Sequence, residues 1–339
     1  MTRRSWALFA AMCVIWGVPY LLIRVAVRDF TPGTLVFARC AIGGLVLLPF
    51  ALMRGGFGPV LRRWRPLLAF TVIELAIPWL LLSDAERVLS SSLTGLLVAA
   101  VPLVGVVVAT VAGSDDRGGG PLRYAGLLLG LVGVVVLLGV DVGEVHAGAL
   151  VEIAFVVVGY AVAPVIMARR LADLPSIPVV SASLLLTAIG YLPYALVRWP
   201  HSISAHAAWS VVGLALVCTA LAFIVFFALI AEIGPARATV ITYVNPAVAL
   251  LLGVLLLDER LTLGIAVGFP LILFGSVLAA RRGVPAGDAP VPEGAVAESL
   301  TDSDQSMRTL PPGVAKVAAA TPWSPSKGDS HSTSTPSSG

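Results

Sequence analysis

Runs of apolar residues, separated by short polar or charged segments, fill the first 280 residues of the sequence. A helix needs about 20 largely apolar residues to cross the roughly 30 Å hydrocarbon core of a bilayer. Ten segments meet this requirement and are predicted to be transmembrane helices: residues 6–26, 32–53, 66–83, 90–112, 122–140, 147–168, 178–197, 207–230, 236–257 and 262–280. The pattern predicts an all-α, polytopic membrane protein.

Composition narrows the class of protein further. The 339-residue chain is 58% apolar and only 12% charged, and its mean hydropathy is +0.96. Soluble domains contain about 45–50% apolar and about 25% charged residues. So few charges cannot keep the surface of a globular domain of this size in water. A soluble enzyme is therefore excluded, and so is a disordered or collagen-like chain.

The arginines predict the orientation of the chain. With the N-terminus in the cytoplasm, the inner segments hold thirteen of them: Arg3, Arg4, Arg54, Arg62, Arg63, Arg65, Arg117, Arg123, Arg169, Arg170, Arg237, Arg281 and Arg282. The outer segments hold Arg28, Arg87, Arg198 and Arg260, with Arg24 near a boundary. Because positive charge favours cytoplasmic loops, we expect a multi-pass protein of the cell (plasma or inner) membrane with both termini in the cytoplasm.

The first five predicted helices share motifs, in the same order, with the last five. A shift of 142–146 residues, with one shorter loop, superposes Trp16-Gly17 on Val158-Gly159, Pro32 on Pro178, Ala100-Val101-Pro102-Leu103 on Val244-Asn245-Pro246-Ala247, and Gly126-xxx-Gly130 on Gly264-xxx-Gly268. We therefore expect two five-helix repeats, residues 1–140 and 141–282. Because five is odd, the second repeat enters the membrane from the opposite side. Such inverted repeats are typical of secondary transporters, whose substrate sites lie near the midplane.

Residues 283–339 differ in kind from the rest of the chain. They are rich in serine, threonine and proline and contain no apolar segment long enough to span a membrane. This composition predicts a disordered cytoplasmic tail. The tail is either regulatory or a dispensable extension.

Arg39, Glu74 and Glu152 are acidic or basic residues inside predicted helices, where a charge costs about 2.5–3.5 kcal/mol on insertion scales. Arg39 is about 10 Å from the outer end of the second helix, and Glu74 is near the middle of the third, at 1.5 Å per residue. Arg39 would bind an anionic group such as a carboxylate, and Glu74 an amine or a proton. The alternative is an Arg39–Glu74 pair that only joins two helices. Glu152, within two turns of the start of the sixth helix, is either a proton-coupling carboxyl or a boundary residue.

Aromatic and polar residues supply further candidates for a substrate pathway. Trp16 and Tyr20 are four residues apart and are expected to share one face of the first helix. Tyr160 lies at helical spacing from Glu152, and Tyr243 and Asn245 precede Pro246 in the ninth helix. The alternative is aromatic packing against a neighbouring helix for Trp16 and Tyr20, and a simple kink of the ninth helix for the residues before Pro246.

Proline and glycine predict the mechanics of the helices. Pro246 and its counterpart Pro102 are candidate hinges, because proline removes a backbone hydrogen bond from a helix. The motifs Gly126-xxx-Gly130 and Gly264-xxx-Gly268 predict close contacts between helices.

Several sequence features of other protein classes are missing. There is no G-x-x-x-x-G-K-[ST] loop to bind ATP, and neither H-E-x-x-H nor G-x-S-x-G is present. The cysteines Cys13, Cys40 and Cys218 are dispersed in apolar segments, and the four histidines do not cluster. We expect a protein that is not an enzyme, without a metal or cofactor and without a nucleic-acid partner.

The residues above resemble the EamA-type family of the drug/metabolite transporter superfamily. The resemblance rests on these motifs: Trp16-Gly17, Pro32 with Arg39, Gly234-Pro235-Ala236-Arg237-Ala238, Tyr243-x-Asn245-Pro246, and Leu257-Asp258-Glu259-Arg260-Leu261-Thr262. It extends over residues 5–282. The resemblance implies a ten-helix transporter, often an exporter of amino acids or other small metabolites.

The favoured hypothesis is thus a secondary transporter, gradient-driven or facilitative, that moves a small metabolite by alternating access. Export of an amino acid or a related metabolite is expected. The alternatives are a multidrug exporter or lipid-carrier flippase, and a membrane sensor that transports nothing. The expected partners are the small-molecule substrate, the lipid bilayer, and protons or another coupling ion, with the chain acting as a monomer or homodimer.

Overall fold

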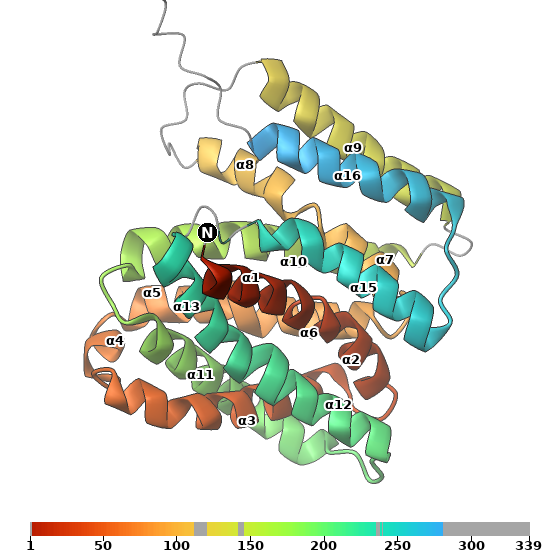
Figure 1. The fold of residues 1–339 in the computed structure, drawn as a ribbon. Coiled ribbons are helices and arrows are strands. Elements are labelled where there is room, and N and C mark those ends of the chain that lie inside the picture. Colours follow the sequence, from red (N-terminus) through yellow and green to blue (C-terminus); the bar gives the residue numbers. More distant parts are fainter. Residues whose placement is uncertain (1, 112–120, 142–145, 235–237, 239, 281–339) are drawn as a thin grey trace, which may run out of the picture. The chain divides into compact units, whose positions relative to one another are not determined.

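The computed structural model describes residues 2–111, 121–141, 146–234, 238 and 240–280, and the described residues belong to one compact unit. All regular elements within these ranges are helices (Figure 1). The predicted tail, residues 283–339, and the first residues of the predicted ninth helix lie outside the described residues.

The α-helices of the first half are α1 (Arg3–Ile15), α2 (Val18–Ala26), α3 (Pro32–Met53), α4 (Gly58–Arg62), α5 (Trp64–Phe70), α6 (Ile77–Ala85), α7 (Ser91–Val98), α8 (Val101–Val111) and α9 (Pro121–Asp141). Those of the second half are α10 (Ala147–Ile166), α11 (Ser176–Arg198), α12 (Ala205–Ala215), α13 (Ala222–Ile233), α15 (Ile241–Leu257) and α16 (Leu263–Ala280). Two π-helical segments, η1 (Thr71–Ala76) and η3 (Leu216–Leu221), join consecutive α-helices, and a third, η2 (Met167–Leu171), directly follows α10.

These elements combine into membrane-spanning lengths. Eight continuous or nearly continuous helical segments of the described chain are long and apolar enough to cross a bilayer: Arg3–Ala26, Pro32–Met53, Trp64–Ala85, Ser91–Val111, Leu122–Gly139, Ala147–Leu171, Ser176–Arg198 and Ala205–Ile233. Two shorter apolar helices follow, Ile241–Leu257 and Leu263–Ala279. The prediction of an all-helical, multi-pass protein is confirmed, and the helices lie where the apolar runs predicted them.

Two of the spans are interrupted. The first is broken at Trp16 and Gly17, just before Pro19, and the fourth at Ala99 and Ala100, just before Pro102. The second break lies beside one of the two predicted hinge prolines. Helix α15, by contrast, continues through Pro246. The helix is therefore interrupted next to Pro102 and continuous through Pro246.

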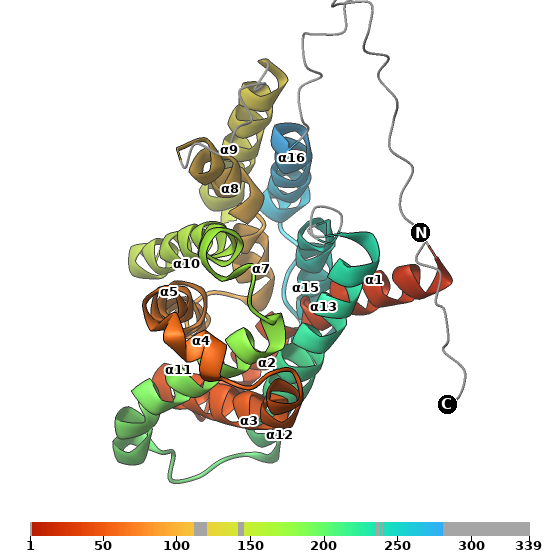
Figure 2. The same cartoon turned by 90° about the vertical axis from the view of Figure 1, so that its left-hand side faces the viewer.

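Helices α9 and α16 lie side by side, as two perpendicular views show (Figures 1 and 2). Their backbones approach closely at glycines. A Cβ atom on Gly133 would lie 2.7 Å from the main-chain nitrogen of Ile272, and one on Gly268 would lie 2.8 Å from the main-chain oxygen of Gly133. Gly126 faces Gly275 and Ala279 in the same way. The predicted close helix contact is confirmed for Gly126, Gly130 and Gly268, since a Cβ atom on Gly275 would also clash with the backbone of Gly130, whereas Gly133 and Gly275 were not foreseen.

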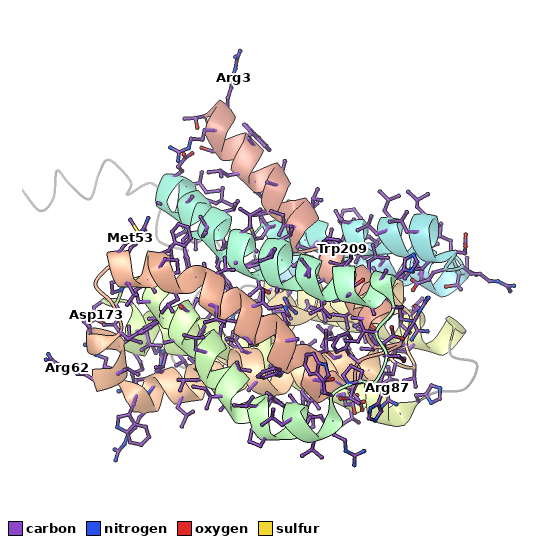
Figure 3. The ribbon with its side chains drawn as sticks, turned by 90° about the horizontal axis from the view of Figure 1, so that it is seen from below. Arg3, Met53, Arg62, Arg87, Asp173 and Trp209 are labelled. Carbon is purple, nitrogen blue, oxygen red and sulfur yellow. The ribbon has the colours of Figure 1, made fainter. Side chains whose placement is uncertain are left out.

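Polar side chains tie the helix ends together. Arg63 forms a bidentate ion pair with Asp173, its Nη2 lying 2.6 Å from Oδ2, and thereby joins the junction of α4 and α5 to the turn between η2 and α11. Arg4 pairs with Glu232 at 3.0 Å, which joins α1 to α13. In Figure 3, Arg62, Met53 and Asp173 lie toward one end of the helices, and Arg87 and Trp209 toward the other.

Candidate functional site

Arg39 lies within α3 and is the most deeply buried arginine of the described residues, with 7% of its surface exposed. Its Nε donates a hydrogen bond of 2.9 Å to the hydroxyl of Thr219, which in turn donates to the main-chain oxygen of Leu214. The guanidinium carbon lies 3.6 Å from the ring centroid of Trp79, a cation–π contact. No hydrogen bond joins the two terminal nitrogens of Arg39 to a residue that the structure describes, so its side chain is held at one edge and over one face.

Two of the three π-helical segments, η1 and η3, carry side chains that lie around Arg39. Glu74 is in η1, with Trp79 three residues beyond its end, and Thr219 is in η3. The hydroxyl of Tyr191 donates to the main-chain oxygen of Ala76, the last residue of η1, at 3.0 Å. π-Helical turns occur frequently at functional sites. Here they set the positions of a carboxyl group and of the hydroxyl that holds Arg39.

Two tyrosines complete the group around Arg39. Tyr160 of α10 lies close enough to Arg39, Glu74 and Trp79 to interact with each of them. Gly159 makes this approach possible, because a Cβ there would lie 2.6 Å from the main-chain oxygen of Ile73 in η1. We define the Arg39 site as Tyr20, Arg39, Glu74, Trp79, Tyr160 and Thr219.

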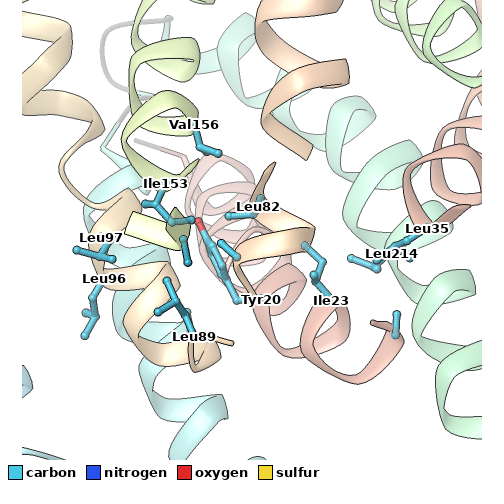
Figure 4. Close-up of a cluster of buried hydrophobic side chains, with 14 of the residues drawn as sticks. Tyr20, Ile23, Leu35, Leu82, Leu89, Leu96, Leu97, Ile153, Val156 and Leu214 are labelled. Atoms are coloured by element: carbon cyan, nitrogen blue, oxygen red, sulfur yellow. The ribbon is translucent and has the colours of Figure 1, made fainter. Parts of the chain in front are cut away.

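Tyr20 of α2 reaches the site through the largest apolar cluster of the described residues. Its ring is 8% exposed and packs among side chains of several helices, including Leu82, Leu89 and Ile153 (Figure 4). Tyr20 interacts electrostatically with Tyr160 and Arg39. Four residues that the sequence singled out separately, on α2, α3, η1 and α10, are therefore neighbours.

No ion pair joins Arg39 to Glu74 among the residues that the structure describes. One carboxyl oxygen of Glu74, Oε2, is buried without a hydrogen-bond partner. The structure therefore does not contain the Arg39–Glu74 ion pair that was the alternative interpretation of these two residues. A buried carboxyl oxygen without a donor is costly, so Glu74 is left with capacity to bind a cationic group or a proton.

Other predicted residues lie elsewhere. The break at Gly17 separates Trp16 from Tyr20, and Trp16 packs against Phe226 and Phe223, with centroid separations of 4.6 and 6.3 Å. The expectation that Trp16 and Tyr20 line one helix face is therefore wrong. They belong to two different apolar clusters, because the interrupted backbone turns them toward different neighbours.

The candidates on α15, and Glu152 on α10, are also outside the Arg39 site. The hydroxyl of Tyr243 lies 3.5 Å from the main-chain oxygen of Ser276 in α16. The amide nitrogen of Asn245 donates to the main-chain oxygens of Cys13 and Ile241, at 3.2 and 2.9 Å. Glu152 lines an open pocket of about 440 Å³ together with Asp84 and His146.

Trp79, Thr219 and Glu86 were not foreseen from the sequence. Trp79 and Thr219 resemble ordinary residues of apolar helices. Glu86 lies in Ser83-Asp84-Ala85-Glu86-Arg87, which resembles an exposed polar connection, yet its side chain is completely buried. A metal site has no support in the described residues, where no group of three or more His, Cys, Asp or Glu side chains could hold an ion.

Comparisons with known proteins agree with one another. The sequence matches the EamA-like transporter family over residues 4–139 and again over 148–281. It is 31% identical over 304 residues to the uncharacterized inner membrane transporter YedA of Escherichia coli (strain K12), covering 80% of this chain and 89% of that one. It is 24% identical to the uncharacterized transporter YdfC of Bacillus subtilis (strain 168), over 74% of this chain and 83% of that one. One solved crystal structure shares the fold, with a TM-score of 0.61 and 23% identity over 83% of this chain and 97% of that one.

Proposed function

Because the chain belongs to the EamA-like transporter family, we propose that it is a secondary transporter that exports an amino acid or a related small metabolite by alternating access. The observation that carries this proposal is the buried Arg39, held by Thr219 and Trp79, with no hydrogen bond from its terminal nitrogens to a described residue. A protein does not bury such a charge within an apolar helix without a counterpart, and a substrate anion supplies one.

The chemistry around Arg39 favours a zwitterion. A guanidinium offers parallel N–H groups that match both oxygens of a carboxylate. Carboxyl groups lie near the same aromatic side chains, Glu74 within the site and Glu86 beside Tyr20 and Tyr160, and one of them can pair with an ammonium group of a small molecule. Trp79, Tyr20 and Tyr160 would pack against an apolar side chain. An α-amino acid combines these three features in one molecule.

Alternating access requires two bodies that can exchange conformations. The proposal therefore includes ten membrane-spanning helices arranged as two inverted repeats, residues 1–140 and 141–282. Its support is the ordered set of shared motifs and the two separate matches to the family, 4–139 and 148–281. The distribution of arginines supports cytoplasmic termini.

A counterflow experiment tests the transport proposal. The purified chain is reconstituted in vesicles loaded with an unlabelled mixture of the twenty proteinogenic amino acids, and each amino acid is added outside in labelled form. We expect transient accumulation of at least one label above that in protein-free vesicles. If folded, reconstituted protein accumulates none of them, the amino-acid proposal is wrong.

The orientation is tested by labelling single cysteines in intact cells with a membrane-impermeant maleimide. The wild-type cysteines, Cys13, Cys40 and Cys218, are all buried, so the unmodified chain is expected to remain unlabelled. Arg62 and Arg87 are exposed. We expect Arg87→Cys to be labelled in intact cells and Arg62→Cys only after permeabilisation. The opposite pattern would reverse the proposed orientation.

A further inference from the structure

Glu86, in the connection between α6 and α7, is the most completely buried carboxyl group of the described residues. Its exposed fraction is 0%, and neither carboxyl oxygen has a hydrogen-bond partner. It lies outside the membrane-spanning segments, which end at Ala85 and resume at Ser91. A carboxylate hidden from water without a donor is strongly destabilised. Some group must therefore neutralise Glu86 whenever it is buried in this way.

The side chains that surround Glu86 come from four elements. Arg24 of α2 donates to its main-chain oxygen, and Tyr20 lies on the same helix. Arg39 of α3 and Tyr160 of α10 also interact with the carboxyl group, and Glu259, between α15 and α16, opposes its ionisation. On its own segment, Asp84 and Arg87 pair with each other at 3.0 Å. Burial outweighs the two arginines and raises the pKa of Glu86 well above its usual range.

Glu86 also adjoins a contact that fixes the start of α7. The carboxylate of Glu259 accepts hydrogen bonds from the main-chain nitrogens of Ser91 and Ser92, at 2.8 and 2.9 Å, and from the hydroxyl of Ser91 at 3.0 Å. A negative charge on Glu86 would repel Glu259 and attract Arg39. Ionisation of Glu86 would therefore weaken the attachment of α7 and act on the Arg39 site at the same time.

From this geometry we infer that Glu86 is the coupling carboxyl group of the transporter, occupied in turn by a proton and by the cationic group of the substrate. In the conformation described, the carboxyl group holds a proton. When α7 moves and water enters, the O–H bond breaks, the electron pair stays on the carboxylate, and the proton passes to water. The ammonium group of the substrate then neutralises Glu86, so that the loaded protein can close again. Binding of a proton and binding of the substrate at Glu86 thereby alternate.

Glu86 fits this role better than the other acidic candidates. Glu74 has one unpartnered oxygen and is partly exposed, and Glu152 lines an open pocket. Only Glu86, among the three, is both fully buried and without a hydrogen-bond partner at either oxygen. Because the inference rests on the proposed transport function, its test needs one measurement that uses the substrate and one that does not.

The first measurement follows proton release in weakly buffered detergent solution containing a pH dye, after addition of the amino-acid mixture used for counterflow. We expect the wild type to release about one proton per amino acid bound, since proton and ligand compete for one group. Glu86→Gln is expected to release none, whereas Glu152→Gln, the matched control, releases protons like the wild type. Glu86→Asp keeps an ionisable carboxyl group and is expected to retain release.

The second measurement is the melting temperature as a function of pH without substrate. A carboxyl group with a raised pKa in the folded state stabilises the protein below its unfolded pKa of about 4.3, and this stability is lost as pH rises through the folded pKa. The Tm of the wild type is thus expected to fall as pH rises, and that of Glu86→Gln to fall less. Parallel curves would overturn the inference.

The two measurements separate the failure of each proposal. Counterflow without proton release, or with release unchanged in Glu86→Gln, overturns the role of Glu86 and leaves the transport function standing. Absence of counterflow with every amino acid overturns the transport proposal, and with it the coupling. If Glu86→Gln does not fold, the wild type and Glu86→Asp still test the inference. It is overturned if the wild type releases no protons, or if folded Glu86→Asp releases none.

Discussion

Arg39→Ala is expected to abolish counterflow, lowering the initial rate by at least about 100-fold. The variant removes the only guanidinium of the Arg39 site and, with it, two charge-assisted hydrogen bonds to the substrate carboxylate. Such bonds contribute about 1.5–3 kcal/mol each, and 1.4 kcal/mol corresponds to a factor of ten in affinity. The rate is measured in vesicles that contain equal amounts of reconstituted protein.

Two further variants separate binding by Arg39 from its effect on folding. Arg39→Lys keeps the charge but loses both the hydrogen bond to Thr219 and the planar stacking on Trp79, so an intermediate loss is expected. Arg63→Ala is the matched control, because Arg63 forms an ion pair with Asp173 in which both side chains are about half exposed. It is expected to transport at the wild-type rate. Wild-type transport by folded Arg39→Ala would exclude Arg39 from the substrate site.

Gly133→Val is expected to prevent the chain from accumulating as a folded protein. The side chain would point into the backbone of α16, because even a Cβ atom would lie 2.7 Å from the nitrogen of Ile272 and 2.9 Å from the oxygen of Gly268. Overpacking of a tight interface costs typically about 1–3 kcal/mol and more where backbone must move, as here. We expect a large loss of monodisperse protein in detergent and a lower Tm for the remainder.

Gly139→Val is the control for this substitution. Gly139 lies on the same helix, and a Cβ there would meet no atom within 4 Å. Both variants lose a glycine and gain the same β-branched side chain, so helix propensity affects them equally. Equal yields of the two variants would show that α9 and α16 can separate without cost, contrary to the packing described above.

Much of the fold was predictable because the membrane imposes a simple rule on sequence. Apolar runs of the length of a bilayer must be helical, and the charges between them mark their ends. The third predicted helix, residues 66–83, corresponds to the helical segment Trp64–Ala85. Arg39 and Glu74 stood out for the same reason, since charge within an apolar helix is costly.

The composition of the site was less predictable, because it depends on how helices rotate against one another. The π-helical segments η1 and η3 shift the direction of every following side chain, and no proline or glycine lies within either. The break at Gly17 sends Trp16 toward Phe226 and Tyr20 toward the central cluster. Glu86 was missed because its polar neighbours made the segment resemble an exposed loop.

The pairing of α9 with α16 also has a consequence for how the chain is made. Ribosomes release α9 into the membrane long before α16 is synthesised, since the whole of α10 to α15 comes between them. Until then α16 is absent, so Gly126 and Gly133 cannot make the close backbone contacts that they make with α16 in the final structure. The carboxylate that holds Ser91 and Ser92 likewise arrives 168 and 167 residues later. The first half of the molecule thus reaches its final state only when translation of the last helices is complete.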